Sequence, residues 1–147
     1  MNSIKYIIFG IIFSAVLFVG CAQDTTNNSK TVNQFDKMQD STKNSITVKQ
    51  LGERMKLNPE LVILDVRNPY ELEEYLGHIE GAVNIPVQEL EKRIDELNKY
   101  RDREIAVICR SGVRSVTATN ILLQNGFNAI NIEGGMIKYR AEENKEQ

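Results

Sequence analysis

Histidine and cysteine are scarce in this chain of 147 residues, which contains one histidine and two cysteines. Structural metal sites in proteins usually take four ligands, mostly from these two residue types, so we expect no metal centre and no bound cofactor. An excess of basic residues is also absent, since 18 Lys and Arg face 20 Asp and Glu. The balance predicts no nucleic acid partner. No internal repeat with a period of about 20 to 50 residues is evident, which argues against a repeat array.

The chain also lacks an apolar run long enough to span a bilayer comfortably. Its longest run, Tyr6 to Val19, is shorter than the roughly 20 residues of a membrane helix, and it suits the apolar region of a signal peptide over residues 1–20. The run ends at Phe18-Val19-Gly20-Cys21, which resembles the lipobox of bacterial lipoproteins, with Phe18 where leucine is usual. The resemblance implies cleavage before Cys21 and lipid attachment to its sulfur. An uncleaved membrane anchor is the alternative, and either would tether the protein outside the cytoplasmic membrane.

If Cys21 carries lipid, Cys109 is the one remaining free thiol and no disulfide can form within the chain. In an exported protein, a single free cysteine points to a reactive thiol rather than to a disulfide scaffold. Residues 22–45 are rich in Asp, Asn, Thr, Ser, Lys and Gln, so with Cys21 we interpret residues 21–45 as a lipidated, disordered tether. A flexible coil of that length spans about 25 to 30 Å.

The most informative stretch runs from Ile105 to Ser115. Ile105 to Ile108 is a continuous apolar run, typical of a buried parallel strand. After Arg114 the apolar residues follow helical spacing up to Asn125-Gly126, a helix stop signal. Cys109 therefore lies between a strand's carboxyl end and a helix's amino end, where open α/β sheets bind their ligands.

The residues around Cys109 suggest a chemical role for its sulfur. Unpaired N–H groups at a helix start, together with Arg110 and Arg114, should favour the thiolate and attract anions. Gly112 can adopt a positive φ and let the backbone curl around the sulfur. A cysteine at the end of an apolar strand can also be a small core residue and nothing more. The two arginines and the glycine favour the functional interpretation.

Strands and helices are expected to alternate along one domain at residues 46–141, followed by a tail at 142–147. Such alternation predicts an α/β fold with a parallel sheet covered by helices on both faces. Leu51 and Met55 are expected to face inward from the first helix, and residues 87–97 to form an amphipathic helix. Asn68-Pro69-Tyr70-Glu71 has the composition of a helix start. The five expected strands are 46–48, 61–66, 82–85, 105–108 and 129–132.

Cys109-Arg110-Ser111-Gly112-Val113-Arg114-Ser115 resembles the active-site loop of single-domain rhodanese-like sulfurtransferases. The resemblance continues, in the expected order, over about residues 46 to 140. It implies a rhodanese-like five-stranded parallel sheet and a Cys109 persulfide, held by the loop from Arg110 to Arg114. It also implies that Asp65 and Arg67 support the site by tying loops together through ion pairs. The further matching segments are Leu64 to Glu71, Gly77 to Pro86 and Glu133 to Met136.

The predicted activity is transfer of sulfane sulfur from thiosulfate or a similar small anionic donor to a thiol, cyanide or a sulfur-accepting protein. We expect a monomer, tethered to a membrane of the cell envelope and facing the periplasm or the cell exterior.

Two alternative functions use the same loop. The first is a relay or binding module with little turnover. A cysteine phosphatase or arsenate reductase is a weaker alternative, because such loops have five residues between cysteine and arginine, whereas four separate Cys109 from Arg114. His78 lies in Gly77-His78-Ile79, which is typical of a turn before a strand rather than of a general base.

Overall fold

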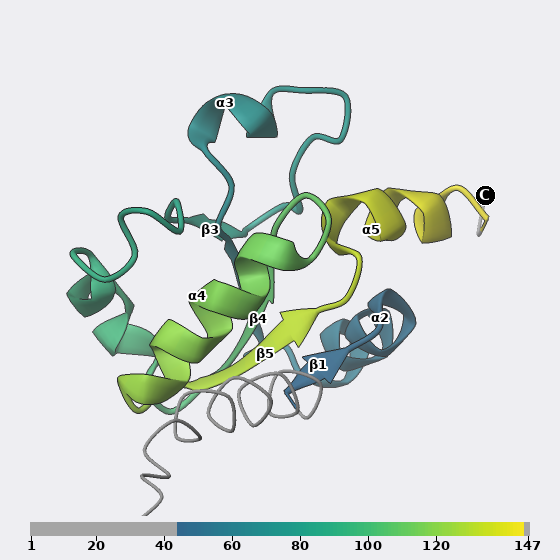
Figure 1. Ribbon diagram of the computed structural model, residues 1–147. Helices are drawn as coiled ribbons and strands as arrows, with labels where there is room; N and C mark the ends of the chain where they lie inside the picture. Colours follow the sequence, from purple (N-terminus) through teal and green to yellow (C-terminus); the bar gives the residue numbers. More distant parts are fainter. Residues whose placement is uncertain (1–43, 146–147) are drawn as a thin grey trace, which may run out of the picture.

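The computed structural model describes residues 44–145. Its centre is a five-stranded sheet in the order β1-β5-β4-β2-β3, in which every neighbouring pair is parallel (Figure 1). β4 and β2 carry the most apolar segments, and both are buried along most of their length. The strand that leads to Cys109 therefore lies in the middle of the sheet. The strands are β1 (Ser45–Ile46), β2 (Val62–Asp65), β3 (Val83–Asn84), β4 (Glu104–Ile108) and β5 (Asn128–Ile132).

Helices cover both faces of the sheet. On one face, α4 (Val113–Gln124) and the 3-10 helix η1 (Ile94–Tyr100) pack over a core that includes Leu97, Val107 and Leu122. On the other face, α2 (Val48–Leu57) and α5 (Gly135–Glu143) pack over a second core. Both layers are visible in Figure 1. Burial of these apolar faces stabilises the fold by about 25 cal/mol per Å² of apolar surface removed from water.

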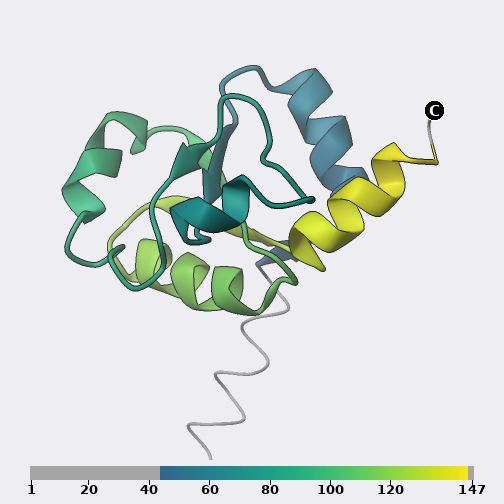
Figure 2. The same cartoon turned by 90° about the horizontal axis from the view of Figure 1, so that it is seen from above.

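A short helix, α3 (Pro69–Leu72), lies beyond the carboxyl ends of the strands. Asn68 precedes it, Pro69 occupies its first turn, and the Glu71 carboxylate accepts a hydrogen bond from the Asn68 N–H at 3.0 Å. Seen from above in Figure 2, α3 lies between α4 and the pair formed by α2 and α5. This placement puts its side chains over the loop that follows β4.

The structure confirms the predicted α/β architecture with its five parallel strands and with helices on both faces. Three local expectations are wrong. The expected first strand at 46–48 ends at Ile46, because Thr47 caps α2 and Val48 is the first residue of that helix. Met55 is 37% exposed, because α2 turns only Val48 and Leu51 fully into the core. Residues 87–97 do not form one regular α-helix; turns lead into η1, although Leu90 and Leu97 are buried as their spacing predicts.

The expected domain end at residue 141 lies inside α5, which continues to Glu143. The predictions for residues 1–20 and for most of 21–45 lie outside the described residues. Within residues 44–145, no helix combines the length and apolar character needed to cross a membrane.

Candidate active site

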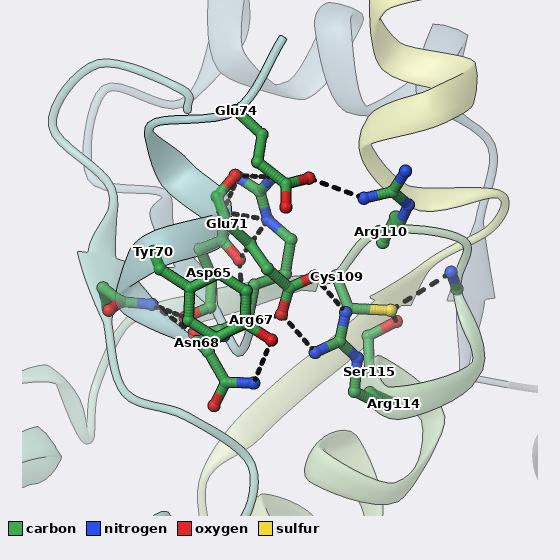
Figure 3. Close-up of polar contacts among 12 residues, drawn as sticks. Asp65, Arg67, Asn68, Tyr70, Glu71, Glu74, Cys109, Arg110, Arg114 and Ser115 are labelled. Atoms are coloured by element: carbon green, nitrogen blue, oxygen red, sulfur yellow. Dashed lines mark hydrogen bonds and ion pairs between the residues drawn. The ribbon is translucent and has the colours of Figure 1, made fainter. Parts of the chain in front are cut away.

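The Cys109 sulfur lies at the point where β4 ends and the loop Cys109–Ser115, called here the cysteine loop, begins (Figure 3). The Cys109 Sγ accepts a hydrogen bond from the Gly112 N–H at 3.2 Å and lies 3.4 Å from the Ser115 Oγ. The cysteine is 1% exposed. Two polar groups therefore face a recessed sulfur, and each can stabilise negative charge on it.

The first turn of α5 holds the cysteine loop from behind. The Met136 N–H donates to the Cys109 carbonyl oxygen at 2.8 Å, and the Ile137 N–H donates to the Arg110 carbonyl oxygen at 3.0 Å. N–H groups in the first turn of a helix have no partner within the helix. Here they fix the two peptide groups on which the orientation of the sulfur depends.

Two glycines make this close approach feasible. Gly112 has φ of +95°, and a Cβ there would lie 2.8 Å from the Gly134 nitrogen. Gly135 has φ of +56°, and a Cβ there would lie 2.8 Å from the Arg110 carbonyl carbon and closer still to the Cys109 carbonyl oxygen. Both positions combine a left-handed backbone with a contact that leaves no room for a side chain.

Arg114, at the start of α4, forms a two-pronged ion pair with Glu71 of α3, as Figure 3 shows. Its two terminal nitrogens donate to the two Glu71 carboxylate oxygens at 2.6 and 2.7 Å. The hydrogen bond from Arg114 is the largest cause that lowers the pKa of Glu71 to about 2. The hydrogen bond to Glu71 likewise raises the pKa of Arg114, and the nearby Cys109 adds to that increase. Glu71 is thus an ionised carboxylate in close contact with a loop arginine.

Arg110 also has a carboxylate partner, but in a more exposed setting. Its Nη1 lies 2.8 Å from the Glu74 Oε2, and its Nη2 donates to the Tyr75 hydroxyl at 3.3 Å. The hydrogen bond to Glu74 is the main cause that raises the pKa of Arg110. Both arginines of the cysteine loop are therefore paired with glutamates from the segment that contains α3.

Asp65 and Arg67 form a buried ion pair beneath this segment. The Arg67 Nη2 lies 2.6 Å from the Asp65 Oδ2, and both side chains are 1% exposed. Arg67 also donates to the carbonyl oxygens of Glu71 at 3.2 Å and Gly77 at 2.8 Å. One guanidinium thus connects the end of β2 to both ends of the segment that contributes Glu71 and Glu74.

The remaining residues expected at the site have simpler positions. Ser111 is exposed at the tip of the loop, and Val113 is 74% exposed. His78 is an exposed residue whose carbonyl oxygen accepts a hydrogen bond from Arg140. Within residues 44–145, no group of three or more His, Cys, Asp or Glu side chains could hold a metal ion.

Sequence reasoning missed the site roles of Glu71, Gly135 and Ser115. The sequence places Glu71 in a helix start and in a segment that resembles the family, and Gly135 in another such segment, but neither pattern assigns these residues a contact with the cysteine loop. Charge complementarity between Glu71 and Arg114 was the available signal, but 43 positions separate the two residues. Their proximity depends on the parallel pairing of β2 with β4, which brings both chain segments to one edge of the sheet.

The model of the rhodanese-like domain family matches residues 47–142. A rhodanese-related protein from Thermoplasma volcanium has a solved structure with 39% identity and a TM-score of 0.60, over 67% of this chain and 91% of that one. A structure from Staphylococcus saprophyticus has 38% identity and a TM-score of 0.56, over 65% of this chain and 91% of that one.

Among curated sequences, the tRNA uridine(34) hydroxylase of Citrobacter koseri is 38% identical over 87 residues. That match covers 56% of this chain but only 24% of the relative. A structure from Rhodopseudomonas palustris has a TM-score of 0.64 over 84% of this chain and 96% of that one, at 24% identity, which shows likeness of fold alone.

Proposed function

The chain belongs to the rhodanese-like domain family, and on this premise we propose that it is a sulfurtransferase that carries sulfane sulfur on Cys109. The observation that carries the proposal is the position of the Cys109 Sγ at the end of β4, with the Gly112 N–H donating to it at 3.2 Å. A sulfur held by a backbone donor at the start of a helix is suited to bear negative charge.

The proposed reaction has two halves. In the first, the Cys109 thiolate attacks the outer sulfur of a donor, a new S–S bond forms, and the rest of the donor leaves with the electron pair of the broken bond. In the second, a thiol, cyanide or an acceptor protein attacks the outer sulfur of the persulfide and restores the thiolate. This is covalent catalysis, for which ping-pong kinetics are expected.

The loop is suited to hold the intermediate. The Gly112 N–H and the Ser115 hydroxyl already face the sulfur, and the first turn of α4 adds N–H groups without helical partners. These fixed dipoles would stabilise a persulfide anion in the way that an oxyanion hole stabilises an oxyanion. Because α5 fixes the loop carbonyls, little reorganisation should accompany the reaction.

A steady-state assay tests the proposal. The purified protein is given thiosulfate or methanethiosulfonate as donor and cyanide as acceptor, and thiocyanate is measured at several concentrations of each. We expect parallel double-reciprocal lines, and a decrease of at least about 1,000-fold in Cys109→Ser, because the nucleophile is lost. Turnover of phosphate esters or arsenate without thiocyanate would support the phosphatase class instead. Sulfur loading without turnover would identify a relay module.

We also propose that lipid on Cys21 tethers the domain to a membrane of the cell envelope. The support is the sequence Phe18-Val19-Gly20-Cys21 after an apolar run. The donor and acceptor would then be compounds or proteins of that compartment, and we propose that the domain acts there as a monomer.

A further inference from the structure

The cysteine loop contains two arginines, and the structure gives each a carboxylate partner. Arg114 is held by Glu71 through two hydrogen bonds of 2.6 and 2.7 Å. Arg110 is held by Glu74 at 2.8 Å. The third arginine near the site, Arg67, is paired with Asp65 at 2.6 Å. The formal charges of these three pairs cancel, so the arginines do not make the site cationic.

Glu73 lies between these two glutamates in the sequence, and its side chain is exposed. A donor with two negative charges would have to displace a glutamate from its arginine or approach a site without free positive charge. Displacing Glu71 is costly, because its carboxylate is 7% exposed and also accepts the Asn68 N–H.

The position of the sulfur limits the shape of the donor as well. Cys109 is 1% exposed, so the transferred sulfur has to be a terminal atom at the narrow end of the donor. Thiosulfate, thiosulfonates and persulfides all have such an atom. They differ in charge, since thiosulfate is a dianion, whereas a thiosulfonate carries one negative charge at its reacting end.

We propose, on the basis of the function proposed above, that this site selects sulfane donors with at most one negative charge at the reacting end, of the persulfide or thiosulfonate class, and that Glu71 and Glu74 impose this selection. With a persulfide donor RS–SH, the Cys109 thiolate forms a bond to the outer sulfur and the RS–S bond breaks. The leaving thiolate RS⁻ takes the electron pair, and the proton stays on the new Cys109 persulfide. Atoms and charge balance without a further oxidant or reductant.

Thiosulfate and methanethiosulfonate form a matched pair of probes, because a methyl group in the second replaces one charged oxygen of the first. The experiment measures kcat/KM for both donors, with cyanide as acceptor, at low and high ionic strength. The proteins are the wild type, Glu74→Gln, Glu71→Gln and the control Glu73→Gln. The control removes an equal charge from an exposed position of the same segment.

In Glu74→Gln we expect the ratio of kcat/KM for thiosulfate to that for methanethiosulfonate to rise about threefold to tenfold, because Arg110 becomes available to the dianion. High salt should reduce this gain, since it screens an exposed charge. Glu71→Gln should change the ratio in the same direction, and Glu73→Gln should leave it near the wild-type value. Thermal melting identifies any variant that fails to fold. If Glu71→Gln fails to fold, Glu74→Gln alone tests the selection by charge, because the Glu74 ion pair is partly exposed and contributes little to stability.

An unchanged ratio in Glu74→Gln, or an equal rise in Glu73→Gln, would overturn the selection by charge while leaving the sulfurtransferase proposal intact. Absence of thiocyanate from both donors in the wild type would overturn the sulfurtransferase proposal, and this inference with it. The two failures are therefore distinct.

Discussion

Gly135 is the residue whose missing side chain allows α5 to contact the cysteine loop. A Cβ there would overlap the carbonyl groups of Cys109 and Arg110, and the backbone has a φ of +56°. Gly135→Ala should therefore lower the free energy of unfolding by at least about 2 kcal/mol. The loop should also move, because the Met136 and Ile137 N–H groups would lose their partners.

Gly52 provides the matched control, since nothing lies within 4 Å of a Cβ built at this position of α2. Gly52→Ala should stabilise the protein by about 0.5 to 1 kcal/mol, because alanine favours a helix more than glycine does. Urea unfolding of both variants measures the difference. Equal changes in the two would contradict the role assigned to Gly135.

At this scale the sequence identified the residues with distinctive chemistry. Cys109, Gly112 and the two loop arginines lie within six consecutive positions, so their proximity requires no tertiary structure. Glu71 was out of reach, because a glutamate at a helix start has an adequate local explanation. The carboxylate partners of Arg110 and Arg114 come from another segment of the chain. Secondary-structure propensities contain no information about which carboxylate will pair with which arginine.

Among the elements, α3 connects stability to pH through Glu71. Its pKa is lowered from an ordinary 4.5 to about 2, mainly by the hydrogen bond from Arg114. A depressed carboxyl pKa stabilises the folded state above the unfolded pKa, and this contribution is lost as the pH falls through the folded pKa. We therefore expect a loss on the order of 2 to 3 kcal/mol between about pH 5 and pH 2.

Urea unfolding at a series of pH values tests this expectation. Glu71→Gln should be less stable than the wild type at pH 7, and its free energy of unfolding should fall less steeply between pH 5 and pH 2. Glu73→Gln, with an exposed side chain, should follow the wild-type curve. Parallel curves for the wild type and Glu71→Gln would show that the ion pair with Arg114 does not contribute to stability.

The central strands β2 and β4 were predictable because their apolar runs are short, continuous and separated by clear turn residues. The secondary structure of residues 87 to 97 was harder to predict. Its apolar spacing fits a helix, and Leu90 and Leu97 do reach the core, but the same burial is achieved by turns and a 3-10 helix. The spacing of apolar residues predicts which side chains face inward. It does not distinguish an α-helix from a series of turns followed by a 3-10 helix.

For the whole molecule, the proposal is that lipid on Cys21 tethers the domain to a membrane. If this residue carries lipid, labelled palmitate should be incorporated into the wild-type protein in a bacterial host, and the protein should sediment with membranes. Cys21→Ser should lose the label. Cys109→Ser should keep both the label and the membrane association, because it changes only the other cysteine. Full retention of the label in Cys21→Ser would contradict lipidation at this position.

The central claim is that Cys109 carries sulfur, and intact mass spectrometry tests it most directly. The purified protein is incubated with methanethiosulfonate or thiosulfate, separated from the donor, weighed, and weighed again after cyanide is added. We predict a gain of one sulfur atom that cyanide removes as thiocyanate, and no gain in Cys109→Ser. An unchanged mass with every sulfane donor, or an equal gain in Cys109→Ser, would contradict the account.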